Sequence, residues 1–469
     1  MDRLEFLKRL GVLTVGASFI GVDVEAATAE AAADDAVAAK DVEKLDFPIK
    51  PLETDVDKPV TVVIIGAGNR GRTYAKYAER FPDALRVVGC ADLNPARREA
   101  MRKKFDIPSE NCFSHFNEVF AREKMADAVI ISTPDNLHFE PCMKALAAGY
   151  DVMLEKPVAP TEKECKQILA QAHKYNRIVG VCHVLRYAPY FIALKQVVDS
   201  GVIGDLVSIQ HMEPIQYAHM AHSYVRGNWH SSKETSPIIL AKSCHDLDII
   251  RWIVGKPCET IAAEGSLHLF KRENMPAGAP ERCTDGCPHE ATCPYSAIDI
   301  YERKKRHTYV FDLPRKDPAL IHEKLKTTDY GRCVFRCDND QCDHYVATMR
   351  FQGGITASFT MDAFTPWGGR RTRIMGTRGF IEGDMKKFVV TDFRTGKQSV
   401  WDKKVSEIPE YKDAGHGGGD LGVVRDFVSA VAHKDESLLS SSIDVSIESH
   451  VMGFKAEKSR LSNKKVAVK

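Results

Sequence analysis

One stretch near the N-terminus limits the possible folds more than any other: VTVVIIGAGNRGRTYAKYAERF, which begins at Val60. Its first six residues form a β-branched run of the kind found in buried parallel strands. Gly66, Gly68 and Gly71 follow, and helical periodicity begins directly afterwards. This order of strand, glycine turn and helix is that of a dinucleotide-binding βαβ unit, in which the helix N-terminus faces a pyrophosphate. A glycine-rich turn in some other α/β protein is the alternative.

The next strand ends in a carboxylate, as such a unit requires. LRVVGCADLNPARR supplies a second apolar strand and, at its end, Asp92. A carboxylate there can accept both ribose hydroxyls of NAD and would repel the 2′-phosphate of NADP. Arg97 and Arg98 lie further along, in the following helix, and keep NADP possible. The sequence therefore predicts NAD as the cofactor.

Strands and helices continue to alternate up to about residue 182. Short apolar strands are followed by polar loops in ADAVIISTPDNLH, DVMLEKPVAP and RIVGVCHVLRYAP. Such alternation predicts a doubly wound parallel sheet, and ligands of these sheets bind beyond the carboxyl ends of the strands. The loops after these strands are therefore predicted to meet at one site.

A second feature is the apolar helix SPIILAKSCHDLDIIRW, which carries ionisable groups. Lys242, His245 and Asp248 are three residues apart and so share one helix face. Two interpretations stay open: the stripe is the solvent-exposed side of an amphipathic helix, or it lines a pocket.

Charge and hydropathy exclude two classes of partner. Lys and Arg number 65 against 64 Asp and Glu, so no global field attracts nucleic acid or an anionic membrane. No apolar stretch of about 18 residues follows the start of the chain, and we expect no membrane span.

The first 26 residues resemble a secretory signal peptide. Arg3, Lys8 and Arg9 precede a short apolar run, and small residues follow. In DRLEFLK, Leu4 stands where a twin-arginine export signal has its second arginine. We therefore predict a signal peptide over residues 1–26 and a periplasmic location, with an uncleaved N-terminal helix as the alternative. Residues 27–57, rich in Ala, Asp and Glu, are predicted to be a linker.

Taken together, GAGNRG, STPDNLH, EKP and the H-x-x-D helix resemble the Gfo/Idh/MocA family, which includes glucose–fructose oxidoreductase, inositol dehydrogenase and NAD-dependent glycosidases. The resemblance implies a Rossmann domain over 58–182, a second α/β domain over 183–415 with an open, largely antiparallel sheet, and C-terminal helices over 416–469. It implies that the second domain binds substrate and forms a homo-oligomer. The exposed face of the strands between 344 and 383, which we expect to be rich in Met, Phe and Val, is the predicted contact surface.

The resemblance also implies site residues by position. Lys156 and His245 correspond to the active-site lysine and histidine of the family, and Lys242 is added as a third catalytic candidate. The residues expected to bind the cofactor are Gly66, Gly68, Asn69, Arg70, Gly71, Asp92, Thr133, Pro134, Asn136, His138, Glu155 and Lys156. Those expected to bind the substrate are Arg186, Tyr187 and Asp246.

One position departs from the family pattern. Dehydrogenases of this type usually carry an aspartate four residues before the histidine, and here that residue is Ala241. Without the carboxylate the histidine is less basic, and neighbouring Lys242 would depress its proton affinity further. We therefore expect a substrate or reaction different from that of inositol dehydrogenase.

These observations predict an NAD(P)-dependent oxidoreductase that transfers a hydride to or from a secondary hydroxyl of a sugar, glycoside or cyclitol. One alternative is an NAD-dependent glycosidase that works by transient oxidation and elimination. Another is a dinucleotide-binding sensor without turnover.

The chain also contains a cysteine-rich insertion over residues 272–342. It holds six of the thirteen cysteines, at positions 283, 287, 293, 333, 337 and 342. Disulfides are favoured in an exported protein, whereas a metal bound by Cys283, Cys287, Cys293 and Cys333 and free thiols are the alternatives.

Overall fold

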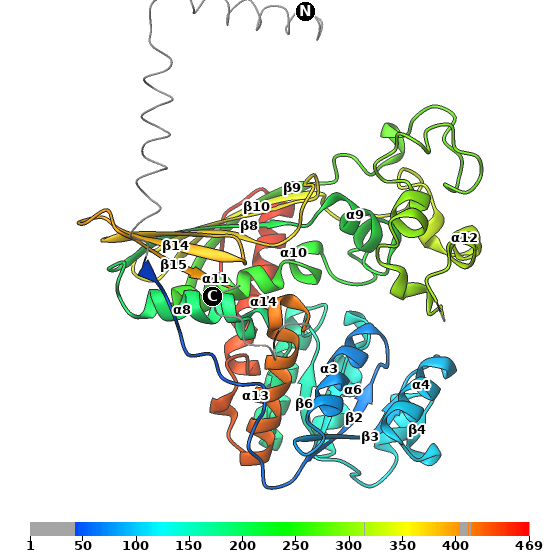
Figure 1. Ribbon diagram of the computed structural model, residues 1–469, viewed down its shortest axis with the longest axis horizontal. Helices are drawn as coiled ribbons and strands as arrows, with labels where there is room; N and C mark the ends of the chain where they lie inside the picture. Colours follow the sequence, from blue (N-terminus) through cyan, green and yellow to red (C-terminus); the bar gives the residue numbers. More distant parts are fainter. Residues whose placement is uncertain (1–42, 314, 404–410, 412–413, 469) are drawn as a thin grey trace, which may run out of the picture.

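The computed structural model describes residues 43–313, 315–403, 411 and 414–468, which form two β-sheets and the helices around them (Figure 1). The predicted signal peptide and residues 27–42 of the predicted linker lie outside the described residues. No helix among the described residues is long and apolar enough to cross a membrane.

The first sheet has six strands, all parallel, in the order β4-β3-β2-β5-β6-β7. Its strands are β2 (Val60–Ile65), β3 (Leu85–Ala91), β4 (Cys112–Phe113), β5 (Ala128–Ile131), β6 (Asp151–Leu154) and β7 (Val179–Val181). Its helices are α3 (Asn69–Arg80), α4 (Pro95–Phe105), α5 (Phe116–Phe120), α6 (Phe139–Ala147) and α7 (Glu162–Tyr175). The strand order reverses between β2 and β5, which confirms the predicted doubly wound sheet and makes the carboxyl ends of these two strands the expected ligand-binding edge.

Successive residues of β2 explain why this sheet is covered on both faces. Val62 and Ile64 belong to one hydrophobic cluster, and Val63 and Ile65 to another. Because neighbouring side chains of a strand point to opposite faces, a continuous β-branched run requires helices on both sides. The C-terminal helix α13 (Gly419–His433) supplies part of one layer, since it packs against α3 and β2.

The second sheet has ten strands in the order β1-β15-β14-β13-β12-β8-β11-β10-β9-β16. They are β1 (Glu43–Lys44), β8 (Leu206–Pro214), β9 (Cys258–Ser266), β10 (His344–Phe351), β11 (Thr356–Asp362), β12 (Arg371–Gly376), β13 (Gly379–Gly383), β14 (Lys387–Asp392), β15 (Gln398–Asp402) and β16 (Val466–Ala467). Within the described strands of this second sheet, only β1–β15 and β8–β11 pair in parallel. This confirms the predicted open, largely antiparallel sheet.

Helices lie between the two sheets and cover one face of the larger one. These are α8 (Pro189–Asp199), α10 (Ile238–Ala241) and α11 (Cys244–Val254), as Figure 1 shows. The long helix α14 (Ile443–Ser462) packs against β9, α11 and α7, and so joins both domains.

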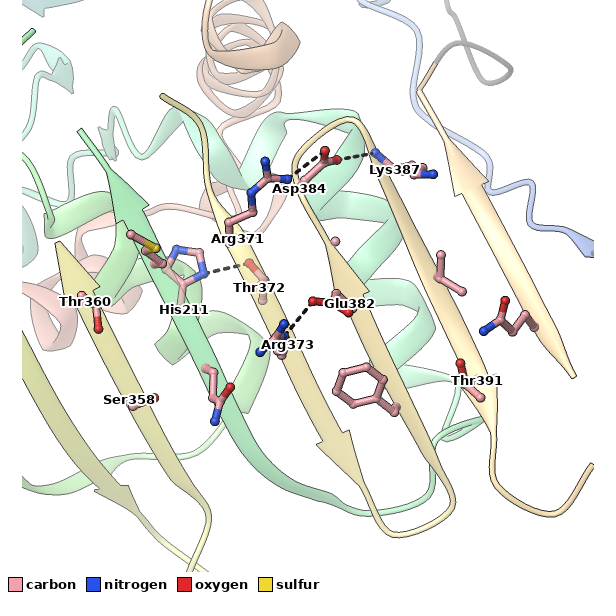
Figure 2. A pocket seen from close by; sticks show the side chains of 16 residues that line it. His211, Ser358, Thr360, Arg371, Thr372, Arg373, Glu382, Asp384, Lys387 and Thr391 are labelled. Carbon is pink, nitrogen blue, oxygen red and sulfur yellow. Dashed lines mark hydrogen bonds and ion pairs between the residues drawn. The ribbon is translucent and has the colours of Figure 1, made fainter. Parts of the chain in front are cut away.

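The opposite face of the large sheet is mixed, because Met212, Phe380 and Val389, which are of the expected apolar kind, lie there among more numerous polar side chains. In β10, Met349 and Phe351 point into the core, while Thr348 and Arg350 are exposed. Around β8 and β11 to β14 this face is hollowed by about 900 Å³ and lined by side chains such as Thr360, Arg373 and Glu382 (Figure 2). The alternation was expected, but the helices cover the apolar side.

The second half of the predicted linker is part of the fold. β1 pairs with β15, and Leu52 is fully buried in the core of the first domain. The Tyr77 hydroxyl donates to the Leu52 carbonyl at 2.7 Å. Residues 43–57 therefore connect both domains by packing, which corrects the expectation of a free linker over this part.

The cysteine-rich insertion, which includes α12 (Pro318–Thr327), lies to one side of the molecule (Figure 1). Cys283, Cys287, Cys293 and Cys333 line one small cavity. All thirteen cysteines are described, and each is a free thiol. Among the described residues no group of three or more His, Cys, Asp or Glu side chains is placed to hold a metal ion.

Candidate active site at the junction of the two domains

The glycine turn after β2 has the shape that a bound pyrophosphate requires. Gly66 has a φ of +94°, and a Cβ there would lie 2.8 Å from the Ser132 backbone. A Cβ on Gly71 would lie 2.1 Å from the Gly66 carbonyl oxygen. At Gly68 the nearest atom, an Arg97 guanidinium nitrogen, would be 3.7 Å away. The turn therefore stays tight at its ends and open at Gly68, where the N-terminus of α3 begins.

Asp92 lies beside this turn. Its Oδ2 accepts the Ala67 N–H at 2.7 Å, and its Oδ1 accepts the Asn94 N–H at 2.8 Å. These bonds hold the carboxylate at the carboxyl end of β3, where a ribose would be recognised. The two nearby arginines are engaged elsewhere: Arg97 with Asp312 of the insertion at 2.8 Å, and Arg98 with the Asp92 carbonyl at 2.5 Å.

The loop after β5 is only partly available to a cofactor. Pro134 and Asn136 are exposed and Thr133 is half-buried, as is compatible with the expected role. His138 is buried, and its two ring nitrogens lie 2.8 Å from the Pro157 carbonyl and 2.9 Å from the Thr133 carbonyl. His138 therefore joins two loops, and its contact with the cofactor stays a prediction. Asn69 is exposed at the start of α3.

Arg70 also has a role different from the expected one. Its Nε lies 2.6 Å from Glu155 Oε1, and its Nη2 lies 2.8 Å from Asp420 Oδ1. Its guanidinium also lies 4.6 Å from the centre of the Tyr74 ring. Arg70 therefore links the glycine turn to the loop after β6 and to α13 rather than facing a phosphate. Burial alone would raise the pKa of Glu155, but the charges of Arg70 and Lys156 outweigh it and keep that pKa below its ordinary value.

Lys156, the first residue beyond Glu155, reaches across the domain junction. Its Nζ donates to the carbonyl of Ala241, the last residue of α10, at 2.8 Å. His245 lies four residues further, in the first turn of α11, and is 4% exposed. Burial, and then the charge of Lys156, lower the pKa of His245 well below its ordinary value. The structure thus brings the two principal candidates together, with the imidazole neutral.

Lys242 and Asp246 belong to a buried ionic cluster. Lys242 Nζ lies 3.1 Å from Glu213 Oε1, and Arg370 Nε lies 2.6 Å from Glu213 Oε2. Asp246 Oδ1 accepts from Arg370 at 2.9 Å and lies 3.0 Å from His211 Nε2. Burial, followed by the charge of Arg370, lowers the pKa of Lys242, although Glu213 partly offsets this.

This cluster changes the assignment of Asp246. Its side chain is fully buried and holds two partners, so it orients the Lys242 cluster instead of contacting a substrate. Glu213, His211 and Arg370 were not predicted, because no local motif marks them: the first two lie in β8, and Arg370 directly precedes β12.

The other two predicted substrate contacts are also structural. Arg186 holds Asp248 through two bonds of 2.7 and 2.6 Å, and its third nitrogen donates to the Ser440 carbonyl. The Tyr187 hydroxyl lies 2.8 Å from Ser441 Oγ. Both side chains are buried. Their polar atoms are filled by protein partners, so neither is available to a substrate. His245 and Asp248 are buried in α11, and Lys242, which lies between α10 and α11, is half-buried, so the three residues do not form a solvent-exposed helix face.

One further histidine, absent from the predicted set, lies beside His245. His416, in the loop before α13, has its ring centre 5.9 Å from that of His245. Its Nδ1 lies 2.9 Å from Asp420 Oδ1. The glycine-rich stretch GHGGGD that surrounds it was the available signal in the sequence.

Comparison with known proteins agrees with this architecture. Residues 60–183 match the family model described as "Oxidoreductase family, NAD-binding Rossmann fold", and residues 195–466 match "Oxidoreductase family, C-terminal alpha/beta domain". YteT of Bacillus subtilis is 26% identical over 384 residues, which span 76% of this chain and 86% of YteT. Inositol 2-dehydrogenase of Ralstonia nicotianae is 30% identical over 196 residues, 41% of this chain and only 53% of that enzyme.

Among solved structures, scyllo-inositol dehydrogenase from Lactobacillus casei with bound NAD(H) and scyllo-inositol superposes with a TM-score of 0.59 at 19% identity, over 88% of this chain and 99% of that one. At this identity the likeness shows the fold. The two family models together cover most of the sequence, from β2 to β16. The protein is therefore a member of the Gfo/Idh/MocA family of oxidoreductases, with an NAD-binding Rossmann domain.

Proposed function

We propose that the protein is an NAD-dependent dehydrogenase that acts on a secondary hydroxyl of a sugar or cyclitol. The observation that carries the proposal is the meeting of Lys156 and His245 at the junction between the glycine turn of the first domain and the helices of the second. Bound NAD supplies the hydride chemistry, while the protein supplies orientation and proton transfer.

Three contacts favour NAD over NADP. Asp92 presents a carboxylate at the ribose position and would repel a 2′-phosphate. Arg97 and Arg98, the two cations that could bind that phosphate, are held by Asp312 and by the Asp92 carbonyl. A bound NADP would have to break the Arg97–Asp312 pair.

Lys156 and His245 are suited to different contacts with the substrate hydroxyl: Lys156 can donate a hydrogen bond and His245 can accept one. An ammonium group has three donors, and the bond to Ala241 uses one of those on Lys156, so two remain for a substrate oxygen. His245 is neutral near pH 7, and a neutral imidazole can accept a hydrogen bond from the substrate hydroxyl. Lys242 would act on the substrate only indirectly, because its Nζ is paired with Glu213.

The substrate class is supported by the relatives. Several are named inositol 2-dehydrogenases, and the chain matches them over about half of their length. A sugar or cyclitol carries the secondary hydroxyl that this proton chemistry requires.

A redox-neutral glycosidase is the second candidate, and Ala241 is the observation that favours it. The carboxylate usual in dehydrogenases of this family is missing at this position, and Lys156 bonds to the backbone there instead. In such an enzyme the cofactor would have to stay bound and return to its starting state in each cycle.

One experiment separates these functions. The purified protein is assayed for bound NAD(H) by absorbance and then mixed with a panel of inositols, free sugars and nitrophenyl glycosides. Accumulation of NADH supports the dehydrogenase, and release of nitrophenol without NADH supports the glycosidase. A protein that binds NAD but changes no member of the panel would contradict both and favour a sensor.

We also propose that the chain is exported to the periplasm and forms a homo-oligomer through the uncovered face of the ten-stranded sheet. The N-terminal sequence supports the first point and the extent of that sheet supports the second. Because polar side chains such as Arg373 and Glu382 lie on this face beside Met212, Phe380 and Val389, we expect both polar and apolar contacts between subunits. Light scattering on the purified protein, and cell fractionation, test these two points.

A further inference from the structure

We propose that His416, oriented by Asp420, is the general base of the site and takes the proton of the substrate hydroxyl at its Nε2. The inference rests on the proposed function and deepens it, because it names a catalytic residue that the family pattern does not supply. In this step the substrate O–H bond breaks and an N–H bond forms at Nε2. The electron pair of the broken O–H bond forms the C=O bond, and the hydrogen on carbon would leave with both electrons of its C–H bond as hydride, for which bound NAD⁺ would be the two-electron acceptor.

The first support is the geometry of the histidine and its carboxylate. Asp420 is 2% exposed, and its Oδ1 lies 2.9 Å from His416 Nδ1. An ionised carboxylate only accepts hydrogen bonds, so Nδ1 carries the proton and Nε2 is left with a lone pair. The His416 side chain is 37% exposed, in contrast to the buried Asp420. This is the arrangement by which a carboxylate fixes the tautomer of a catalytic histidine.

Asp420 is itself held in place. Arg70 donates to Asp420 Oδ1 at 2.8 Å and to its Oδ2 at 3.3 Å. Arg70 also binds Glu155, the residue before Lys156. The same arginine therefore fixes the loop that carries Lys156 and the carboxylate that orients His416.

The backbone around His416 has an uncommon conformation and is closely packed. His416 has a φ of +52°, in the left-handed region that non-glycine residues rarely occupy. A Cβ on Gly419 would lie 1.8 Å from the Val184 carbonyl, and one on Gly415 would lie 2.1 Å from Asp420 Oδ2. Only glycine at these two positions allows the backbone to come so close to the Val184 carbonyl and to Asp420. A non-glycine residue held in a rare backbone conformation, as His416 is, is typical of functional sites.

His245, the family histidine, lacks this support. Its Nδ1 is buried and has no hydrogen-bond partner among the described residues. The two rings are 5.9 Å apart between centres, so a substrate oxygen near one lies near the other. Of the two, His416 is the one that has a carboxylate to stabilise the imidazolium formed on proton transfer.

The charges around His416 agree with a neutral base. Asp420 and Arg70 face it from α13 and α3, and Lys242 and His245 face it from the second domain. Burial lowers its pKa below the ordinary value, while the hydrogen bond and charge of Asp420 raise it and partly offset the effect. The ring is therefore unprotonated at Nε2 near pH 7, and removal of the Asp420 charge should lower its pKa further.

The test combines histidine-selective ¹⁵N NMR of the full protein with pH–rate profiles on a turned-over compound of the panel. The signal that disappears in His416→Gln identifies His416 in the spectrum of the wild-type protein, where we expect a single Nδ1–H tautomer. In Asp420→Asn we expect a lower pKa of His416 and a mixture of its two tautomers. We expect His416→Gln to reduce kcat/KM by roughly 10²- to 10⁴-fold, with partial rescue by added imidazole, and Asp420→Asn to shift the acidic limb of the profile to lower pH.

A matched control is the surface pair His173–Asp444, which has the same 2.9 Å spacing with both side chains exposed. His173→Gln and Asp444→Asn should leave kcat/KM unchanged. NAD affinity retained in Asp420→Asn shows that this variant folds.

Two results would overturn the inference: full activity of His416→Gln, or a wild-type His416 without a fixed tautomer. Failure of the proposed function is distinct, because it appears as absence of turnover by the wild-type protein, and the NMR measurement then still decides the state of His416.

Discussion

Lys156 Nζ donates to the Ala241 carbonyl at 2.8 Å, so the strand-end lysine of the first domain is held by the position where related dehydrogenases carry an aspartate side chain. The bond crosses the junction between the domains. It fixes the ammonium group close enough to His245 for its charge to lower the pKa of that imidazole.

We predict that Lys156→Ala reduces kcat by at least about 10³-fold while NAD affinity stays nearly constant, because the Lys156 ammonium donates to the substrate oxygen whereas the glycine turn binds the cofactor. Steady-state kinetics and fluorescence titration with NADH measure the two effects. Lys166→Ala, on the exposed side of α7, is the control. Unimpaired turnover of Lys156→Ala would remove this lysine from the site.

Asp92→Ala should weaken NAD binding by about tenfold or more. The change removes the ribose acceptor and the two backbone bonds, to Ala67 and Asn94, that shape the turn. Calorimetric titration measures the affinity, and exposed Asp83 provides the control substitution to Ala. Equal affinities of wild type and Asp92→Ala would contradict the cofactor assignment.

Asp312→Ala should raise the affinity for NADP relative to NAD by about tenfold, because it frees Arg97, now held at 2.8 and 3.0 Å, for a 2′-phosphate. The ratio of the two dissociation constants is the readout. Asp329→Ala, an exposed carboxylate of the same insertion, should leave the ratio as it is. An unchanged ratio in Asp312→Ala would show that Arg97 does not face the ribose.

Arg186→Met should lower the free energy of unfolding by about 3–5 kcal/mol, since it leaves Asp248 buried without its partner. Urea unfolding measures this loss. Lys195→Met breaks an ion pair on α8 whose Asp199 is largely exposed, and should cost at most about 1 kcal/mol. Similar losses in both variants would argue against the buried pair.

The free energy of unfolding should also fall in acid because of His183. Burial lowers its pKa from 6.5 to about 3, although Asp248 acts in the opposite direction. Between these values the unfolded chain binds a proton that the folded protein does not, so each step to lower pH favours unfolding. We expect His183→Asn to reduce the slope of the free energy of unfolding against pH by up to about 1.4 kcal/mol per pH unit over this window. Parallel pH profiles for the two proteins would mean that His183 is protonated in the folded state.

The sequence was most informative where structure is local. The β-branched run before Gly66 and the acid at Asp92 predicted the first sheet correctly, because strand, turn and helix propensities act over a few residues. The residues whose contacts the sequence did not predict are those whose partners lie far along the chain. Arg186 pairs with Asp248, 62 residues away, and Arg70 with Asp420, 350 residues away. The sequence identifies a charged residue, but it does not reveal which distant residue forms an ion pair with it.

Contacts between distant parts of the chain also decide which face of the large sheet is covered and whether His416 lies at the site, so neither could be predicted from local sequence. Period-two alternation predicted the strands around Met349, but only the packing of α8 and α11 decides which side is covered. His416 joins the site because α13, at the far end of the sequence, packs on α3.

The central claim is that bound NAD places its nicotinamide ring between Lys156 and His245. A crystal structure of the protein with NAD tests it most directly. We expect the pyrophosphate at the Gly68 turn, the adenosine ribose on Asp92 and the nicotinamide ring beside the Lys156 ammonium and the His245 imidazole. A nicotinamide ring bound away from both side chains would contradict the account.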